Sequence, residues 1–562
     1  MASWIRILWR FSNQTPFGRS MQQRESVIQE RLRVFSRLGT RNKANRRFFH
    51  APKRVTHALR SSVPTLPALA LTLGLASLMW WKTGQSPTSK LAALGSRYAT
   101  KAEMEKAIAE VVVDLGDDSV SIDDEVLFSH GFSEWSNYNA DRLPVAVVFP
   151  SSTEDVAQIV KISKRYRIPL IPYSGGSSVE GNISAPYGGF SIDFVNMNKI
   201  VELHAEDMDV VVQPSVSWMD LNEKIKESGL FFPMDPGPTA QIGGMVGTNC
   251  SGTNAVRYGT MRDWVLNLTV VLSDGSVVKT RRRPRKSSAG YNLNGLFVGS
   301  EGTLGIVTEI TLKLAPAPEA TAVAVVSFQS MRSAAQAAVA VVRKGIPINC
   351  VEILDDVQMS VINRVGNTDR VWKEAPTLFF KFAGSKGIVK ESIAEVSEII
   401  KDHGGSNFQF SKDEKSQKQL WSARKEALWS MLSLRTSGTG VWSTDVAVPL
   451  SRVADLIETC KKDLNETGLF GGMVGHVGDG NFHETILFDG EDEKAKVEKC
   501  VHDMVENAIK MDGTCTGEHG VGIGKKAFLQ IELGDGPLKL MRSIKQTFDP
   551  YYLMNPGKIF DI

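Results

Sequence analysis

The chain has 562 residues, of which 42% are hydrophobic and 23% are charged, and it contains five cysteines. This length allows about three or four domains of roughly 100–200 residues each, and it excludes a small disulfide-stabilised scaffold. The composition is that of a globular protein, which excludes a wholly disordered chain and a polytopic membrane protein. The cysteines are scattered and form no C-x-x-C pair, so they indicate neither a disulfide framework nor a zinc ribbon.

The net charge of +3 is the sum of two segments of opposite sign. Residues 1–60 contain 14 Lys and Arg and 2 Asp and Glu, whereas the remaining 502 residues contain 51 basic and 60 acidic side chains. The first segment is therefore +12 and the rest of the chain is −9. An acid-poor segment whose arginines recur at helical spacing is typical of a mitochondrial transit peptide, which we predict over residues 1–60. The alternative is a basic arm that binds nucleic acid or anionic lipid.

An uncharged apolar segment follows at residues 61–81. It is about as long as the ~20 residues of a membrane-spanning helix, and Trp80, Trp81 and Lys82 stand where interfacial side chains would lie. We predict a hydrophobic transmembrane or sorting segment over 61–82, either kept as an anchor or cleaved; a buried core helix is the alternative. A basic presequence before such a segment favours the mitochondrial inner membrane, with the catalytic part facing the intermembrane space.

The first part of the remaining chain is predicted to contain a β-α-β unit. A polar, helical lead-in over 83–140 precedes a short apolar strand at 145–149. Ser152 to Asp155 form a capping-box pattern that begins an amphipathic helix ending near Tyr166. A strand at 168–171 then runs into a loop rich in Gly and Ser. Further strands are predicted at 209–213, 265–272 and 305–314, with a helix at 218–227, and Pro316-Ala-Pro318 marks a boundary.

From residue 319 strands and helices alternate in the manner of ferredoxin-like sheets. Strands are predicted at 322–328 and 377–383 and helices at 331–343, 389–402 and 451–467, with the run 471–488 continuing the pattern. The fold class is therefore α+β, with domain limits at 141–318, 319–520 and 521–562. The basic run Arg281–Lys286 is interpreted as a solvated loop, and a docking site for an acidic partner is the alternative.

Glycine is concentrated in three loops, near residues 175–181, 237–259 and 299–305. No G-x-G-x-x-G and no Walker A sequence occurs, so neither a Rossmann site nor a P-loop is supported. Loops rich in Gly, Ser, Thr and Asn let the backbone approach a ligand and direct N–H groups at anionic oxygens. The loops therefore indicate a pyrophosphate-containing cofactor; tight turns without a ligand are the alternative.

Histidines and carboxylates form a further cluster. Three of the nine histidines lie in His476-Val-Gly-Asp-Gly-Asn-Phe-His483 and in Glu518-His519. A Gly-rich turn between two short strands would bring His476 and His483 to one side. Two imidazoles and one carboxylate suit Zn²⁺, Mn²⁺ or Fe²⁺ with open positions for a substrate. Polar residues satisfied within Gly-rich turns are the alternative.

Five ordered motifs make the chain recognisable: residues 172–178, 235–244, 249–254, 257–259 and 299–307. Together they resemble the FAD-binding domain of the vanillyl-alcohol-oxidase type flavoproteins, and in particular the D-2-hydroxyacid dehydrogenase branch. The resemblance covers about 145–562. It implies a PCMH-type FAD-binding domain of two α+β subdomains over 141–318, a ferredoxin-like substrate and metal-binding cap over 319–520, and a C-terminal segment over 521–562 that returns to the flavin.

The resemblance also implies site residues. FAD would be held without a covalent bond, because the first glycine loop offers neither His nor Cys. Its contacts would be Pro172, Tyr173, Ser174, Gly175, Gly176, Ser177, Ser178, Asp235, Pro236, Thr239, Gly243, Gly244, Asn249, Ser251, Gly252, Tyr258, Gly259, Glu301, Gly302, Gly305, Ile306, Val307 and Asn555. Zinc or manganese would lie on His476, His483 and Glu518. His519 would be the base and Arg424 the clamp for the substrate carboxylate, with Asp445 and Lys381 as further candidates.

The resemblance implies that the activity is the oxidation of D-lactate to pyruvate. The metal would chelate the hydroxyacid, His519 would take the hydroxyl proton, and hydride would pass to FAD. The chain has no C-x-x-C-H haem motif, and the resemblance points to cytochrome c as the electron acceptor. No nucleic-acid partner is expected. Alternatives are a D-2-hydroxyglutarate or other D-2-hydroxyacid dehydrogenase with a different acceptor, a non-redox ether-lipid synthase relative, and a metal-dependent hydrolase or membrane-tethered binding module.

Overall fold

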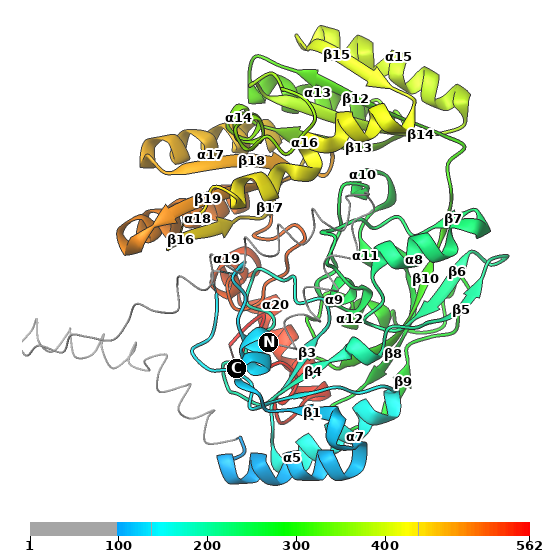
Figure 1. Ribbon diagram of the computed structural model, residues 1–562, viewed down its shortest axis with the longest axis vertical. Coiled ribbons are helices and arrows are strands. Elements are labelled where there is room, and N and C mark those ends of the chain that lie inside the picture. Colours follow the sequence, from blue (N-terminus) through cyan, green and yellow to red (C-terminus); the bar gives the residue numbers. More distant parts are fainter. Residues whose placement is uncertain (1–97, 137, 437, 562) are drawn as a thin grey trace, which may run out of the picture. The chain divides into compact units, whose positions relative to one another are not determined.

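A computed structural model describes residues 98–136, 138–436 and 438–561 of the chain (Figure 1). The predicted transit peptide at 1–60 and apolar segment at 61–82 lie outside these residues. Among the residues described, no helix combines the length and the apolar character needed to cross a membrane.

The first sheet is built around the predicted β-α-β unit. Its strand order is β1 (Val120–Ser121), β2 (Ala146–Val148), β4 (Phe190–Asp193) and β3 (Leu170–Tyr173). Helix α7 (Thr153–Tyr166) connects β2 to β3, and its predicted capping box is formed by Ser152 and Asp155. Both β2 and β3 pair in parallel with β4. The unit is therefore confirmed, with a strand that the sequence did not indicate inserted at its centre.

The lead-in is helical, as expected, over α5 (Lys101–Leu115) and α6 (Asp124–Gly131). The lead-in also contributes to the first sheet, because β1 pairs with β2. Helix α5 buries Ala107 and Val111 in the core that contains α7. The sequence pattern missed β1, since two residues are too few to show an alternation.

The second sheet has five antiparallel strands in the order β5 (Ile200–His204), β6 (Asp209–Val212), β10 (Ile306–Lys313), β8 (Val265–Val271) and β9 (Val277–Lys279). The three strands predicted in this part of the chain are confirmed as β6, β8 and β10. Helices α8 (Trp218–Ile225) and α9 (Ile242–Thr248) pack their apolar residues in the same core. The remaining elements are short: β7 (Leu230–Phe231), paired with β11 (Ala315–Pro316), and the one-turn helices α10 (Ala255–Tyr258), α11 (Met261–Trp264) and α12 (Asn294–Phe297).

The basic run after β9 is tied to this sheet. Arg283 contacts Asp207 and Asp209, each at 2.8 Å, and Arg285 donates to the carbonyl of Met208. Part of its positive charge is thus matched within the protein.

The cap contains an eight-stranded sheet. The path runs β15 (Ser406–Ser411), β12 (Ala320–Ser327), β14 (Thr377–Gly384), β13 (Ile348–Leu354), β18 (Phe470–Gly475), β19 (Asn481–Asp489) and β16 (Thr439–Ser443), with β17 (Val446–Ala447) paired to β19. The first four strands in the chain take the spatial order 4-1-3-2 and are antiparallel. This is the ferredoxin-like arrangement that the alternation of strands and helices predicted.

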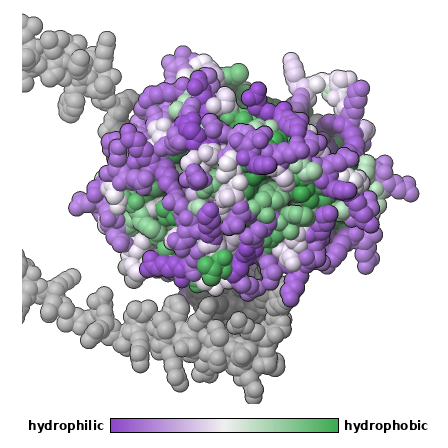
Figure 2. Space-filling view, turned by 90° about the horizontal axis from the view of Figure 1, so that it is seen from above, coloured by the Kyte–Doolittle hydropathy of each residue, from purple (hydrophilic) through white to green (hydrophobic). Residues whose placement is uncertain are grey.

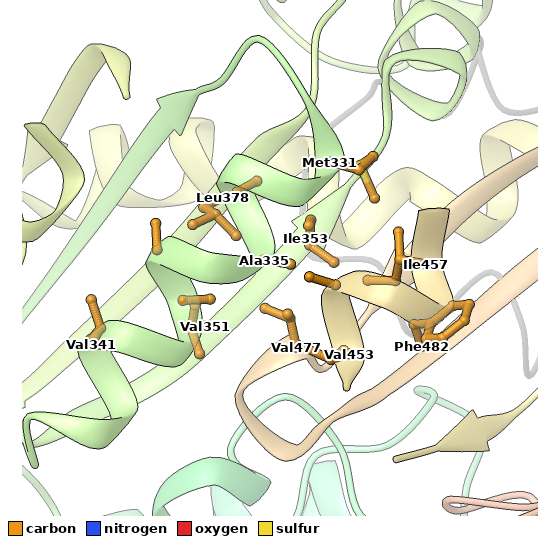
Figure 3. Packing of buried hydrophobic residues seen from close by; sticks show 14 of the residues in the cluster. Met331, Ala335, Val341, Val351, Ile353, Leu378, Val453, Ile457, Val477 and Phe482 are labelled. Carbon is orange, nitrogen blue, oxygen red and sulfur yellow. The ribbon is translucent and has the colours of Figure 1, made fainter. Parts of the chain in front are cut away.

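Helices cover both faces of the cap sheet. Helices α13 (Met331–Arg343), α15 (Lys386–Asp402), α17 (Val453–Thr467) and α18 (Gly490–Lys510) bury one face in a large apolar core. Figure 3 shows Met331, Ala335 and Val341 of α13 against Val351 and Ile353 of β13. The other face is packed by α14 (Asp356–Val365) and α16 (Glu414–Leu432). Seen from above, the molecule presents mainly hydrophilic residues with smaller hydrophobic areas between them (Figure 2).

The C-terminal segment returns to the first sheet. After α19 (Lys526–Leu533) and α20 (Asp535–Phe548), Met554 forms a parallel bridge with Leu170 of β3. The buried ammonium of Lys545 donates to the carbonyls of Thr303 and Met554, at 2.6 and 2.7 Å. The end of the chain therefore holds the third glycine loop in place.

Candidate functional site

The three glycine loops lie together although they are far apart in the sequence. A Cβ on Gly175 would stand 2.7 Å from the carbonyl oxygen of Thr239, and one on Gly302 would stand 2.7 Å from Cγ of Pro172. The amide of Glu301 donates to the carbonyl of Gly247 at 2.8 Å. Glycine is required at these contacts because the chains approach each other too closely for a side chain.

The first loop is fixed by hydrogen bonds of its own. Ser174 Oγ donates to the carbonyl of Pro214 and to Gln241 Oε1, at 3.0 and 2.9 Å, and Ser178 bonds to Asn182. Gly176 has a φ of +62° and lies against the hydroxyl of Tyr173. Burial, with a smaller effect from Asp193, raises the pKa of Tyr173 to about 12, so its hydroxyl stays protonated.

Helix α9 presents a face without side chains. Gly244 and Gly247 lie one turn apart, and a Cβ on either would meet nothing within 4 Å, whereas one on Gly243 would lie 2.6 Å from Pro214. Two bare positions on one helix face beside two glycine loops leave backbone accessible to a flat or extended ligand. This arrangement fits a dinucleotide such as FAD.

Several predicted FAD contacts use their side chains within the protein. The ring of Tyr258 packs against Phe231 and Trp264, and Ile306 is fully buried in the first core. Asn555 Nδ2 donates to the carbonyl of Glu301 at 2.7 Å, and its Oδ1 accepts from Lys558. These side chains shape the loops, and their contact with the cofactor remains a prediction.

Glu301 and Asp235 are also engaged by neighbouring backbone. The Glu301 carboxylate accepts from the amides of Val521 and Gly522, and Asp235 accepts from Thr253 Oγ1 and the amide of Asn254. Burial raises the pKa of both carboxyl groups, that of Glu301 to about 7. The remaining predicted FAD contacts lie in the same three loops or border them: Pro236, Asn249, Gly252, Gly259, Gly305, Ser177 and Val307.

The predicted metal ligands converge. One donor atom from each of His476, His483 and Glu518 lies within 4.8 Å of the others. Glu518 Oε1 is 3.1 Å from Nε2 of His476 and 3.4 Å from Nε2 of His483. His476 follows β18 and His483 lies on β19, and Val477–Asp479 form the expected turn between the two strands. The structure thus brings the three predicted ligands to one position.

The second nitrogen of each imidazole is already engaged. His476 Nδ1 lies 2.8 Å from Glu352 Oε1, and His483 Nδ1 lies 2.9 Å from the carbonyl oxygen of Thr444. Both acceptors require hydrogen on Nδ1, so Nε2 is the nitrogen of each ring that faces Glu518. Two imidazole nitrogens and a carboxylate oxygen form a donor set that fits a divalent cation, which would take the place of a proton between them.

The charged groups around the cluster shift one another's pKa. Burial disfavours the protonated form of His476, but the carboxylates of Glu352 and Glu518 outweigh it and raise its pKa well above the usual value. Burial alone would raise the pKa of Glu518, yet His476 and His483 hold it well below its usual range. The pocket therefore favours positive charge between its carboxylates.

The loop that carries Glu518 and His519 is anchored on Asp445. Asp445 Oδ2 accepts from the amides of Gly517, Glu518 and His519 at 2.7 to 3.0 Å, and Oδ1 accepts from Asn481 Nδ2. Burial opposes its charge, but Lys525 and the nearby imidazoles hold its pKa well below the usual range. Asp445, a further candidate from the sequence, thus shapes the site through the backbone of this loop.

His519 lies beside the metal ligands. Its ring stacks on that of His483 with centroids 5.1 Å apart, and its Nδ1 is 3.7 Å from Glu180 Oε1. Among the described residues Nδ1 has no hydrogen-bond partner. Burial lowers the pKa of His519, but Asp445 and Glu180 outweigh it and the pKa is raised. An imidazole in this position can exchange a proton with a group held at the cluster.

Arg424 reaches the cluster through a residue that sequence reasoning missed. Its Nε donates to Glu352 Oε2 at 2.8 Å, and Glu352 also contacts His476. Glu352 was not predicted because strand β13 was not predicted; a single carboxylate within the apolar run Ile348–Leu354 was the available signal. Lys381, on the adjacent strand β14, places its ammonium 3.9 Å from the ring centroid of Trp421.

The glycine loops and the metal-type cluster form one site. Ser251 Oγ, in the second glycine loop, donates to Glu518 Oε2 at 2.6 Å. Nearby, Cys350 Sγ of the cap lies 3.1 Å from Asn254 Oδ1 of the same loop. A flavin in the loops would therefore lie next to a substrate held at the cluster.

Comparison with known proteins agrees with this geometry. The chain matches the FAD binding domain family over residues 144–281 and the C-terminal domain of FAD linked oxidases over residues 317–559. It is 47% identical over 445 residues to the mitochondrial D-lactate dehydrogenase (cytochrome) of Arabidopsis thaliana, covering 79% of this chain and 78% of that protein. It is 45% identical over 477 residues to the protein of the same name from Kluyveromyces lactis, covering 83% of each.

Among solved structures, 4-ethylphenol oxidase from Gulosibacter chungangensis has the same fold, with a TM-score of 0.68 at 18% identity, covering 82% of this chain and 98% of that one. The two family matches and the two aligned relatives show that the chain belongs to the FAD-linked oxidases and is a flavin-dependent oxidoreductase.

Proposed function

We propose that this protein oxidises D-lactate to pyruvate with FAD as cofactor and passes the electrons to cytochrome c. The observation that carries the proposal is the bond between Ser251 and Glu518, which joins the FAD-type loops to the donor cluster. The two aligned relatives carry the name D-lactate dehydrogenase (cytochrome), which supports the choice of substrate and acceptor.

The cofactors would occupy the two halves of this site. Non-covalent FAD along the glycine loops would accept the α-hydrogen with its electron pair, and Zn²⁺ or Mn²⁺ on His476, His483 and Glu518 would acidify the substrate hydroxyl as a Lewis acid.

Protein side chains orient the substrate and move its proton. Arg424 contacts Glu352 through Nε, so its two Nη groups remain for a bidentate contact with the substrate carboxylate. His519 accepts the hydroxyl proton at Nε2, because Glu180 faces Nδ1 and favours hydrogen there. The Asp445 carboxylate keeps the 517–519 backbone in position during this transfer.

We place the enzyme in mitochondria, at the inner membrane, with its catalytic part facing the intermembrane space. The relatives are named mitochondrial, and the basic segment at 1–60 followed by the apolar segment at 61–82 supports this membrane location. Cytochrome c would be accessible on that side.

Anaerobic titration of the purified holoenzyme tests the proposal. D-lactate should bleach the flavin absorbance with about one equivalent per FAD, L-lactate should not, and cytochrome c added afterwards should restore the oxidised spectrum. Bleaching by D-2-hydroxyglutarate and not by D-lactate would overturn the substrate assignment. A reduced enzyme that does not react with cytochrome c would overturn the acceptor.

Chelation tests the metal separately. Treatment with a strong chelator followed by its removal should abolish turnover while FAD stays bound, and Zn²⁺ or Mn²⁺ should restore activity. An enzyme that keeps full activity after its metal content has fallen to background would remove the cation from the mechanism.

A further inference from the structure

Glu352 is a buried carboxylate at the centre of the cap sheet. It lies on β13, is 1% exposed, and belongs to the face opposite to the one that Val351 and Ile353 bury against α13. The pairing of Ile353 with Gly475 brings Glu352 beside His476, which follows β18. A charge is rarely buried unless it is paired, so the partners of this carboxylate indicate what it does.

Each oxygen of Glu352 has a different partner. Oε1 accepts from Nδ1 of His476 and Oε2 accepts from Nε of Arg424, both at 2.8 Å. Burial opposes the negative charge of Glu352, but these two partners outweigh it and hold its pKa below the usual value. Because both partners are donors, only a carboxylate can satisfy both at once.

The two partners of Glu352 have different roles in the proposed reaction. His476 offers Nε2 to the cation, and Arg424 offers its Nη groups to the substrate carboxylate. The other ligand, His483, has its hydrogen bond at Nδ1 with the uncharged carbonyl of Thr444, and the carboxylate nearest to that nitrogen, that of Asp445, is 3.7 Å away and makes no ion pair with Arg424. Glu352 is therefore the charged connection between the ligand cluster and the arginine.

We propose that Glu352 is a positioning residue that orients His476 for the cation and Arg424 for the substrate carboxylate, and so couples the two binding events. This inference rests on the metal site of the proposed function. Removing the shared carboxylate should weaken metal binding and substrate binding together, whereas a residue acting only on the cluster would weaken the first alone.

The test compares Glu352→Gln with a matched control, Glu484→Gln. Both positions are buried glutamates of the cap sheet, on strands that are separated by β18; Glu484 lies on β19, and its carboxylate has no hydrogen-bond partner among the described residues. Glutamine at 352 can accept from one donor, and its amide group then faces the other donor without an acceptor. Purified holoenzymes are measured for Zn²⁺ and Mn²⁺ affinity by competition with a chelator, for FAD content, and for the KM of D-lactate at saturating metal.

We expect Glu352→Gln to bind metal about 10–100-fold more weakly than wild type, to raise the KM for D-lactate at saturating metal, and to retain its FAD. Glu352→Asp, which keeps the charge with a shorter reach, should recover part of both losses. Glu484→Gln should match wild type in all three measurements.

The outcomes separate this inference from the proposed function. Metal affinity within twofold of wild type, or weaker metal binding with an unchanged KM, would overturn the coupling by Glu352 while leaving the metal site intact. A wild-type protein that binds neither cation would overturn the metal site and the coupling together. If Glu352→Gln does not fold, Glu352→Asp decides by the same two measurements.

Discussion

The chemistry of single residues here depends on which nitrogen of each imidazole is engaged. Nδ1 of His476 and of His483 is bonded to a protein acceptor, so Nε2 of each is available to the cluster. His519 differs, because its Nδ1 is 3.7 Å from Glu180 and has no hydrogen-bond partner among the described residues. In the proposed reaction the three histidines therefore divide into two ligands and one proton acceptor, because their partners differ.

His519→Ala tests this division. Loss of the base should lower the rate of flavin reduction by D-lactate by about 10²–10⁴-fold, which is the usual contribution of a positioned base. FAD and metal content should remain those of wild type, since the side chain is not a ligand. The rate is measured by stopped-flow bleaching of the flavin.

His502→Ala is the control, because this histidine lies on α18 with its side chain 50% exposed. It should reduce its flavin at the wild-type rate. A His519→Ala enzyme that reduces its flavin as fast as the control would show that another group takes the proton.

At the scale of elements, the turn between β18 and β19 determines where His476 and His483 lie. Gly480, directly before β19, has a φ of +75°, and a Cβ there would overlap the carbonyl oxygen of Val448. Gly468, at the end of α17, has nearly the same conformation, with a φ of +72°, and a Cβ there would meet nothing within 4 Å. Both glycines have a positive φ, but only Gly480 lacks room for a side chain.

Alanine at each glycine should separate these effects. Gly468→Ala should cost about 1 kcal/mol of stability, from the left-handed conformation alone, with metal content unchanged. Gly480→Ala should cost about 1–3 kcal/mol more and lower the metal affinity, because the turn must move to relieve the overlap. Urea unfolding and chelator competition measure the two quantities. Equal metal affinity in both variants would contradict the role of the turn.

At the scale of the whole molecule, charge is divided unequally along the chain. Residues 61–562 carry a net charge of −9, although the complete chain is +3. Cytochrome c is basic, so the proposed electron transfer should be favoured by long-range attraction, which salt screens over a Debye length of about 10 Å at 0.1 M.

Salt dependence tests this attraction. With cytochrome c as acceptor, kcat/KM should fall by about tenfold as ionic strength rises from roughly 20 to 200 mM. With ferricyanide, a trianion, the rate should stay level or rise over the same range. Both are measured in steady state at saturating D-lactate on enzyme purified without residues 1–60. A cytochrome c rate that does not change with salt would exclude steering by the net charge.

The sequence alone determined the features that depend on local pattern. The capping box before α7, the limits of α13, the ferredoxin-like alternation and the Gly-rich turn between His476 and His483 were all predicted, because period, caps and glycines act over a few residues. The flavin loops and the proposed metal ligands were predicted from motifs of the same short range.

Only the tertiary structure decided which distant residues meet. Strand β13 was missed because its residues are buried on both faces and show no alternation, and with it Glu352 was missed. The contacts of Ser251 with Glu518, of Glu352 with Arg424, and of Asp445 with the 517–519 loop span 72 to 267 residues of sequence. Strand register and the packing of the cap set these contacts, and neither is encoded in a local stretch of the chain.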